Sequence, residues 1–338
     1  MEKRKQVMPF YEPADGRLWQ GRVDGDTWES RRWHQCVELF NVLVHPDKEV
    51  AMPALLAGQK GFAFIGFCCD EGVVRNQGRP GAGFAPGQLR KACASLPVHF
   101  EQGIRLVDLG DIVCRDHDLE GAQLALGILV ESAVTRGFCP IVLGGGHEVV
   151  YGHYIGFTAL AQKIGIINFD AHFDLRIPAA AGPSSGTGFW QIAEDCKASG
   201  RSFHYLPIGI QQHANTRELY NIAAQMGVKP IHANEFIPAN ETGIIQAINE
   251  FIEVTDHVYL TIDLDVFAAA YAPGVSAVGP TGLIPDAFFE RVLAHVIQQG
   301  KVISFDIAEL NPTYDIDNRT AKLGAWLIFN LVSLHPNR

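Results

Sequence analysis

From residue 60 onward, short apolar runs alternate with helical stretches, and this alternation limits the folds that the chain can adopt. The apolar runs, rich in β-branched and aromatic residues, lie near 61–68, 104–108, 139–143, 164–169, 203–210, 228–233, 257–263 and 301–307. The helical stretches lie near 86–96, 118–136, 148–162, 189–199, 216–226, 243–254, 285–299 and 318–333. Eight strands, most of them joined by helices, predict one α/β sheet with helices on both faces.

The first 60 residues do not follow this pattern. They are rich in tryptophan and polar residues, and we expect an extension packed on the main domain, with a short helix near 28–43. The remainder, 61–338, contains no internal repeat, low-complexity tract or convincing linker and is expected to form a single domain. Continuous apolar runs such as 164–167 are typical of parallel strands that are buried on both faces.

Composition and charge narrow the class of protein. Of the 338 residues, 47% are hydrophobic and 19% are charged, which is sufficient for a large core. Lys and Arg number 27 against 37 Asp and Glu, a net charge of −10, whereas nucleic acids and anionic membranes bind basic patches. No uncharged apolar run approaches the roughly 18 residues of a membrane span. We expect a cytoplasmic enzyme with a small-molecule substrate and neither a nucleic-acid nor a membrane partner.

Three polar motifs each follow a predicted strand directly. Gly144-Gly145-Gly146-His147-Glu148 comes after the run at 139–143, and a second motif at 170–176 reads DAHFDLR. Asp263-Leu264-Asp265 ends the run that begins near 257. Ligands bind parallel sheets outside the carboxyl ends of the strands, so these motifs are expected to share one site.

The spacing within these motifs predicts a metal centre. In an extended segment, positions i, i+2 and i+4 face the same way, so alternate side chains of each motif can converge. Carboxylates gathered in one crevice resist ionisation unless cations are present, and two divalent ions would balance four of them. Two imidazoles and four carboxylates favour Mn²⁺, with Fe²⁺, Co²⁺ or Zn²⁺ as substitutes. The candidate ligands are His147, Asp170, His172, Asp174, Asp263 and Asp265.

Such a pair of ions would serve hydrolysis. Two metals about 3.5–4 Å apart can share a water, ionise it near neutral pH and direct it at an electrophilic carbon. Each motif alone is also compatible with a turn or a helix cap. Their joint occurrence at three strand ends favours a catalytic centre.

The sequences GGGHE, DAHFD and TIDLD, at 144–148, 170–174 and 261–265, resemble the ureohydrolase family, which includes arginase, agmatinase and formimidoylglutamase. The resemblance covers residues 60–333. It implies a three-layer α/β/α sandwich around an eight-stranded, mostly parallel sheet, with 61–338 as the catalytic domain. It also implies two Mn²⁺ per chain on the six ligands named above, and a homo-oligomer.

Within that family, the chain looks most like the formimidoylglutamase branch, whose members hydrolyse N-formimidoyl-L-glutamate to L-glutamate and formamide in histidine degradation. The stretches that carry this likeness are 18–24, 33–35, 70–79, 184–189 and 272–276.

Two departures from the arginase and agmatinase pattern fit the same branch. The chain reads Ser185-Gly186-Thr187 where those enzymes carry a His-Gly pair for proton transfer. After Asp265 it also lacks their Asp-Pro pair, so the proton donor stays open.

The resemblance suggests further residues around the substrate. Arg176 stands where arginase has an Asn at the amino-acid end of its substrate, and an Arg could hold a carboxylate bidentately or pair with a neighbouring acid. Arg75, Arg79, Asn76 and Ser185 are further candidates for substrate contact, with solvated loop positions as their alternative.

Glu309 matches the family's Glu after a late strand, which meets the cationic nitrogen group of the substrate. Asp174 would pass a proton to the departing amine, whereas Glu148 and His153 are interpreted as supporting residues. Two other readings remain: a ureohydrolase acting on a guanidino acid or agmatine, and an inactive metal-binding scaffold. Arg176 and the missing His argue against the first, and the intact ligand set argues against the second.

Overall fold

The computed structural model describes residues 2–44, 50–160 and 162–336, and within them one sheet of ten strands organises the chain. The strands run in the order β1-β4-β3-β5-β10-β9-β6-β7-β8, with β2 also paired to β4. Every pairing is parallel except that of β1 with β4. The strands are β1 Tyr11–Glu12, β2 Val37–Leu39, β3 Gly61–Cys68, β4 Arg105–Val113, β5 Phe138–Leu143, β6 Ile164–Phe169, β7 His204–Ile210, β8 Ile231–His232, β9 His257–Asp263 and β10 Val302–Ala308.

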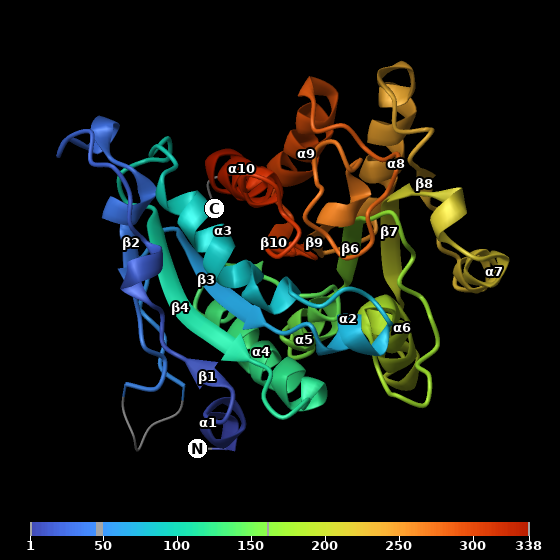
Figure 1. Ribbon diagram of the computed structural model, residues 1–338, viewed down its shortest axis with the longest axis horizontal. Coiled ribbons are helices and arrows are strands. Elements are labelled where there is room, and N and C mark those ends of the chain that lie inside the picture. Colours follow the sequence, from blue (N-terminus) through green and yellow to red (C-terminus); the bar gives the residue numbers. More distant parts are fainter. Residues whose placement is uncertain (1, 45–49, 161, 337–338) are drawn as a thin grey trace.

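Helices cover both faces of the sheet. Figure 1 shows α3, α8, α9 and α10 on one face and α4, α5 and α6 on the other, which confirms the predicted three-layer sandwich. The helices are α1 Glu2–Val7, α2 Glu71–Arg75, α3 Ala85–Ala94, α4 Leu119–Val134, α5 Val149–Ile155, α6 Gly188–Ala198, α7 Arg217–Gln225, α8 Glu241–Glu253, α9 Ala287–Gln298 and α10 Arg319–Leu334. In the described part of the chain, no helix is both long and apolar enough to cross a membrane.

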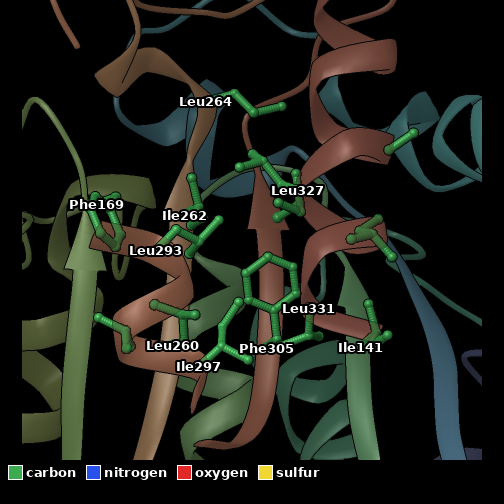
Figure 2. Packing of buried hydrophobic residues seen from close by; sticks show 14 of the residues in the cluster. Ile141, Phe169, Leu260, Ile262, Leu264, Leu293, Ile297, Phe305, Leu327 and Leu331 are labelled. Atoms are coloured by element: carbon green, nitrogen blue, oxygen red, sulfur yellow. The ribbon is translucent and has the colours of Figure 1, made fainter. Parts of the chain in front are cut away.

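The core on the α9 and α10 face illustrates how the layers hold together. Asp286 begins α9 by accepting hydrogen bonds from Phe288 N (2.9 Å) and Phe289 N (3.0 Å), which satisfies backbone donors that the helix leaves free. Side chains four residues apart then face the sheet, and each fully buried one contributes about 1.5–3 kcal/mol. Figure 2 shows this packing among Leu260, Ile262, Leu293, Ile297, Phe305, Leu327 and Leu331.

The strand count expected from the sequence, eight, is too low by two. All eight predicted strands are present, and the additional strands β1 and β2 come from the first 60 residues. The helix expected near 28–43 is wrong: two 3-10 turns, Trp28–Ser30 and Trp33–Gln35, precede β2 there. Strands of two or three residues are too short for an alternating pattern to appear.

A buried charge cluster fixes this N-terminal segment to the sheet. The guanidinium of Arg90 is fully buried and pairs with Asp108 at 2.7 Å and Asp111 at 2.6 Å. The indole of Trp19 donates to the same Asp108 carboxylate at 2.7 Å. The buried carboxylate of Asp108 requires hydrogen-bond donors, and the Trp19 indole is one of them. This hydrogen bond therefore holds the N-terminal segment against β4.

Candidate metal centre

The three predicted motifs meet at the carboxyl ends of strands in the middle of the sheet. The loop 144–148 follows β5, the loop 170–176 follows β6, and a 3-10 turn, Leu264–Val266, follows β9. Strand β10 lies between β5 and β9, and Glu309 follows it directly. A side chain at Gly145 would lie 1.7 Å from Cys69 O, so only glycine allows the first loop to approach β3 this closely.

All six predicted ligands lie together in two groups. His147, Asp170, Asp174 and Asp263 each offer one ligand atom, and these atoms lie within 4.8 Å of one another. Asp170, His172 and Asp265 form a second group by the same measure. Because Asp170 belongs to both groups, two cations held there would be neighbours that share one carboxylate.

Both imidazoles turn Nδ1 toward the carboxylates. His147 Nδ1 lies 2.8 Å from Asp174 Oδ2, 3.1 Å from Asp170 Oδ2 and 3.4 Å from Asp263 Oδ2. His172 Nδ1 lies 3.1 Å from Asp265 Oδ2. Ligand atoms about 2.1 Å from one ion in octahedral geometry are roughly 3 Å apart, so the spacing of these donors fits a shared cation.

The electrostatics of the site also fit a cation. Burial raises the pKa of Asp263 well above its usual value, and the charges of Asp265 and Asp170 raise it further. Burial likewise raises the pKa of Asp265, whose Oδ1 is buried without a hydrogen-bond partner among the described residues. Burial without a compensating charge is unfavourable for carboxylates, and divalent ions would balance both charges and bind the unpartnered oxygen of Asp265.

The backbone brings these side chains together in a different way from the extended geometry expected. Asp170 Oδ1 accepts from His172 N at 2.7 Å, and Asp263 Oδ1 accepts from Asp265 N at 2.8 Å. Asp174 adopts a left-handed φ of 47°. The i and i+2 residues therefore converge through turns that the aspartates themselves close, rather than by alternation along a strand.

Asn215, which sequence reasoning missed, holds the second motif in place. Its Nδ2 donates to Ala171 O at 2.8 Å and its Oδ1 accepts from Phe173 N at 3.0 Å. One buried amide thus pairs with two backbone groups between the ligands of this loop. An isolated Asn after β7 carries no sequence signal for that role, because its partners lie more than 40 positions away.

A cavity of about 350 Å³ opens above the ligands. Asn76 and Ser185 line it and are joined by a hydrogen bond of 3.1 Å from Asn76 Nδ2 to Ser185 Oγ. Arg176 also lines it, and its guanidinium makes no hydrogen bond or ion pair with any residue that the structure describes. A side chain at Gly186 would lie 2.9 Å from Arg176 Cδ, so glycine leaves room for this arginine.

The other two candidate arginines have protein partners. Arg75 donates to Glu71 at 3.0 Å and Glu120 at 2.7 Å, and also to two backbone carbonyls. Arg79 lines the cavity, donates to Ser276 O at 3.0 Å and lies 4.0 Å above the Tyr314 ring. These pairings do not favour the expected role of Arg75 as a carboxylate ligand, because its charge is already balanced by two acids.

Glu309 lies beside the metal ligands. Its Oε1 accepts from His147 N at 2.8 Å, its φ is 65°, and its side chain lines the cavity. Burial raises its pKa well above the usual value, and the nearby charge of Glu148 adds to the shift. Glu148 itself does not line the cavity: its Oε1 accepts from Gly72 N at 3.0 Å, and burial raises its pKa to about 7.

Comparisons with known proteins agree with this geometry. The sequence profile described as the Arginase family matches residues 60–333. The formimidoylglutamase of Chromobacterium violaceum is 44% identical over 96% of this chain and 100% of that protein, and the formimidoylglutamase of Clostridium tetani is 39% identical over 95% of each. A crystal structure of Trypanosoma cruzi formiminoglutamase with Mn²⁺ superposes with a TM-score of 0.71 and 25% identity, covering 82% of this chain and 95% of that one.

The two relatives match nearly the whole chain, and the range of the family profile contains all six candidate ligands. The chain therefore belongs to the arginase family.

Proposed function

We propose that the chain is a formimidoylglutamase, a hydrolase that converts N-formimidoyl-L-glutamate and water to L-glutamate and formamide. The observation that carries the proposal is a donor set of six residues for two cations, at the base of a cavity. The wall of this cavity includes Arg176, whose guanidinium has no partner among the described residues. Curated relatives about 40% identical over almost their full length carry that name.

The metal assignment is Mn²⁺, two ions per chain. The donor set of imidazoles and carboxylates without thiolates suits this ion. Bound there, a pair of divalent ions supplies Lewis-acid polarisation and a nucleophilic water at neutral pH.

Recognition of the substrate's glutamate end falls to the cavity wall. The guanidinium of Arg176 is a planar group of donors with no acceptor in the described part of the chain, and one carboxylate of the substrate would bind it bidentately. The hydrogen-bonded pair of Asn76 and Ser185 lies on the same wall and offers polar atoms for a second contact. Agmatine has no carboxylate, so this wall favours an amino-acid amidine.

The reacting end of the substrate lies between Glu309 and Asp174. The amidinium is cationic, and Glu309 would bind it as a carboxylate because a nearby positive charge favours the ionised form. Asp174 would pass a proton to the departing glutamate nitrogen, which then leaves as an amine. Its carboxylate lies 2.8 Å from His147 Nδ1, within the first group of candidate ligands.

From the resemblance to the ureohydrolase family we expect a homo-oligomer that works in histidine degradation. From the composition we expect a cytoplasmic protein. The net charge of −10 gives no support to a nucleic-acid partner.

The test is turnover by Mn²⁺-loaded protein on N-formimidoyl-L-glutamate, with arginine, agmatine and guanidinobutyrate in parallel. Activity on the first compound alone supports the proposal. Urea release from a guanidino compound would assign the chain to another ureohydrolase activity. Two bound Mn²⁺ per chain without turnover of any substrate would favour a scaffold.

A further inference from the structure

A line of buried hydrogen bonds leads from the metal centre into the sheet. His147 Nε2, the nitrogen turned away from the carboxylates, lies 3.1 Å from Thr261 Oγ1. Thr261 Oγ1 in turn donates to Asp306 Oδ1 at 2.5 Å. Thr261 on β9 and Asp306 on β10 are direct neighbours in the sheet register, and both are fully buried.

The line of hydrogen bonds ends at Asp306, whose second carboxylate oxygen has partners of its own. Its Oδ2 lies 2.7 Å from His153 Nδ1 and accepts from the Tyr259 hydroxyl. With partners on both oxygens, this buried carboxylate is held in one orientation. The mechanism described above uses none of these residues except His147.

The protons on this line can be assigned. A threonine hydroxyl has one proton, and here it is donated to Asp306. The remaining lone pairs of Oγ1 can only accept, so the proton between Thr261 and His147 belongs to His147 Nε2. With Nε2 engaged by Thr261, Nδ1 is the ring nitrogen that faces the carboxylates of Asp174 and Asp170, at 2.8 and 3.1 Å. It is the atom that would meet a cation held there.

We propose that Asp306 is a positioning residue for the metal centre: through Thr261 it keeps His147 in the tautomer and ring orientation in which Nδ1 is the ligand. This inference rests on the proposed metal centre but not on the identity of the substrate. Partners of this kind commonly change metal affinity by about 10–100-fold when they are removed.

The effect is expected at one of the two cation sites. His147 belongs to the group with Asp174 and Asp263, whereas the second group uses His172. The imidazole of His172 is one-quarter exposed, and no comparable line of hydrogen bonds begins at its Nε2 among the described residues. Loss of Asp306 should therefore weaken the His147 site selectively.

The experiment titrates metal-free, full-length protein with Mn²⁺ and follows free Mn²⁺ by electron paramagnetic resonance. We expect two sites in the unaltered protein. Thr261→Val removes the hydroxyl and preserves shape, and Asp306→Asn removes the charge. Each should weaken one site about 10–100-fold and leave the other unchanged. The double variant should be no worse than Thr261→Val alone, because both changes interrupt the same line.

Two further variants separate positioning from general stability. Thr261→Ser keeps the hydroxyl and should restore the affinity of the unaltered protein. Ser304→Ala removes the hydroxyl 2.5 Å from His153 Nε2, on the side of the network away from His147, and should leave both Mn²⁺ affinities intact. Thermal unfolding of each metal-free variant shows whether it folds.

Two results would overturn the proposal. One is a Thr261→Val protein that binds both Mn²⁺ ions as tightly as the unaltered protein. The other is an Asp306→Asn effect that persists in full in the Thr261→Val background, since Asp306 would then act through the sheet rather than through Thr261. Because binding is measured without substrate, failure of the proposed hydrolase activity would leave either result interpretable.

Discussion

At the scale of single residues, Arg176 distinguishes this site most clearly from one that binds an amine. Its guanidinium lies at the cavity over Gly186 and has no acidic partner in the described structure, whereas Arg75 nearby is balanced by Glu71 and Glu120. Because a free guanidinium beside a site is available to a ligand, Arg176 is the residue expected to determine preference for a carboxylate substrate.

Arg176→Ala tests that role. We expect KM for N-formimidoyl-L-glutamate to rise about 10–100-fold with kcat within a few-fold of its original value, because a contact distant from the reacting carbon contributes equally to ground and transition states. Steady-state kinetics give both constants. Arg201→Ala, which alters a partly exposed arginine whose guanidinium donates to Ser199 Oγ at 2.8 Å, is the matched control. An unchanged KM would remove Arg176 from the substrate site.

Asn215 gives a second prediction at this scale. Asn215→Ala leaves Ala171 O and Phe173 N without their buried partner, and each such loss costs about 1–3 kcal/mol. We expect the free energy of unfolding, measured in urea, to fall by about 1–3 kcal/mol for each of the two bonds. Mn²⁺ affinity should fall as well. A variant with normal Mn²⁺ affinity would show that the loop keeps its shape unaided.

At the scale of elements, the sequence could predict seven strands of 6–9 residues and their helices, because each is long enough for its pattern to appear. The eighth, β8, is two residues long and lies within the apolar run predicted at 228–233. It could also predict that the six candidate ligands lie together, since the spacing of Asp170, His172 and Asp174 is visible in one short segment. The turns that orient them, closed by the aspartates' own side chains, were beyond pattern reasoning. The roles of Asn215 and Asp306 could not be predicted either, because they depend on partners in distant elements.

Strand β4 and the N-terminal segment illustrate the same point. Trp19 was visible in the sequence, but its hydrogen bond to Asp108 depends on a partner 89 positions away. Strands β1 and β2 pair with β4, so the order of this edge of the sheet depends on contacts that cross the boundary near residue 60.

Trp19→Phe tests how firmly this edge is held. The change keeps most of the ring but removes a donor to a buried carboxylate, so we expect the free energy of unfolding to fall by about 1.5–3 kcal/mol. Trp28→Phe, which loses only a bond to the Phe100 carbonyl, should cost about 0.5–1.5 kcal/mol. Urea denaturation compares the two, and equal losses would contradict a special role for the charged acceptor.

At the scale of the whole molecule, the metal centre links cation binding to stability. In the metal-free protein, burial raises the pKa of Asp263 and Asp265, so the folded state binds protons more tightly than the unfolded state. The pKa of His147 is also raised: burial acts to lower it, but hydrogen bonds to Asp170 and Asp174 outweigh that effect. Burial acts to raise the pKa of Asp170, but its hydrogen bonds to His147 and His172 outweigh that effect and lower the pKa. Asp170 therefore acts in the opposite direction.

The sign of the pH dependence follows. A raised folded-state pKa contributes stability below the unfolded-state pKa, and this contribution is lost as pH rises through the folded-state value. The metal-free protein should therefore lose thermal stability as pH increases from about 5 to 8. With Mn²⁺ the trend should reverse, because the ligands must be deprotonated to bind the ion. Differential scanning calorimetry with and without chelator tests this, and parallel curves in the two states would contradict it.

Saturation with Mn²⁺ should itself raise stability. At a free concentration of about 100 times Kd, each site adds about 2.7 kcal/mol if the unfolded chain does not bind the ion. Calorimetry over a series of Mn²⁺ concentrations measures this gain. A Tm independent of Mn²⁺ would argue against the cluster as a metal site.

The central claim is that the chain uses this centre to cleave one bond of an amidine, and identification of the products tests it most directly. Mn²⁺-loaded protein is supplied with N-formimidoyl-L-glutamate labelled with ¹³C at the formimidoyl carbon, and the products are followed by NMR. The account predicts labelled formamide and L-glutamate in equal amounts, because the proton goes to the glutamate nitrogen. Release of ammonia with labelled N-formylglutamate, or no turnover while Mn²⁺ is bound, would contradict it.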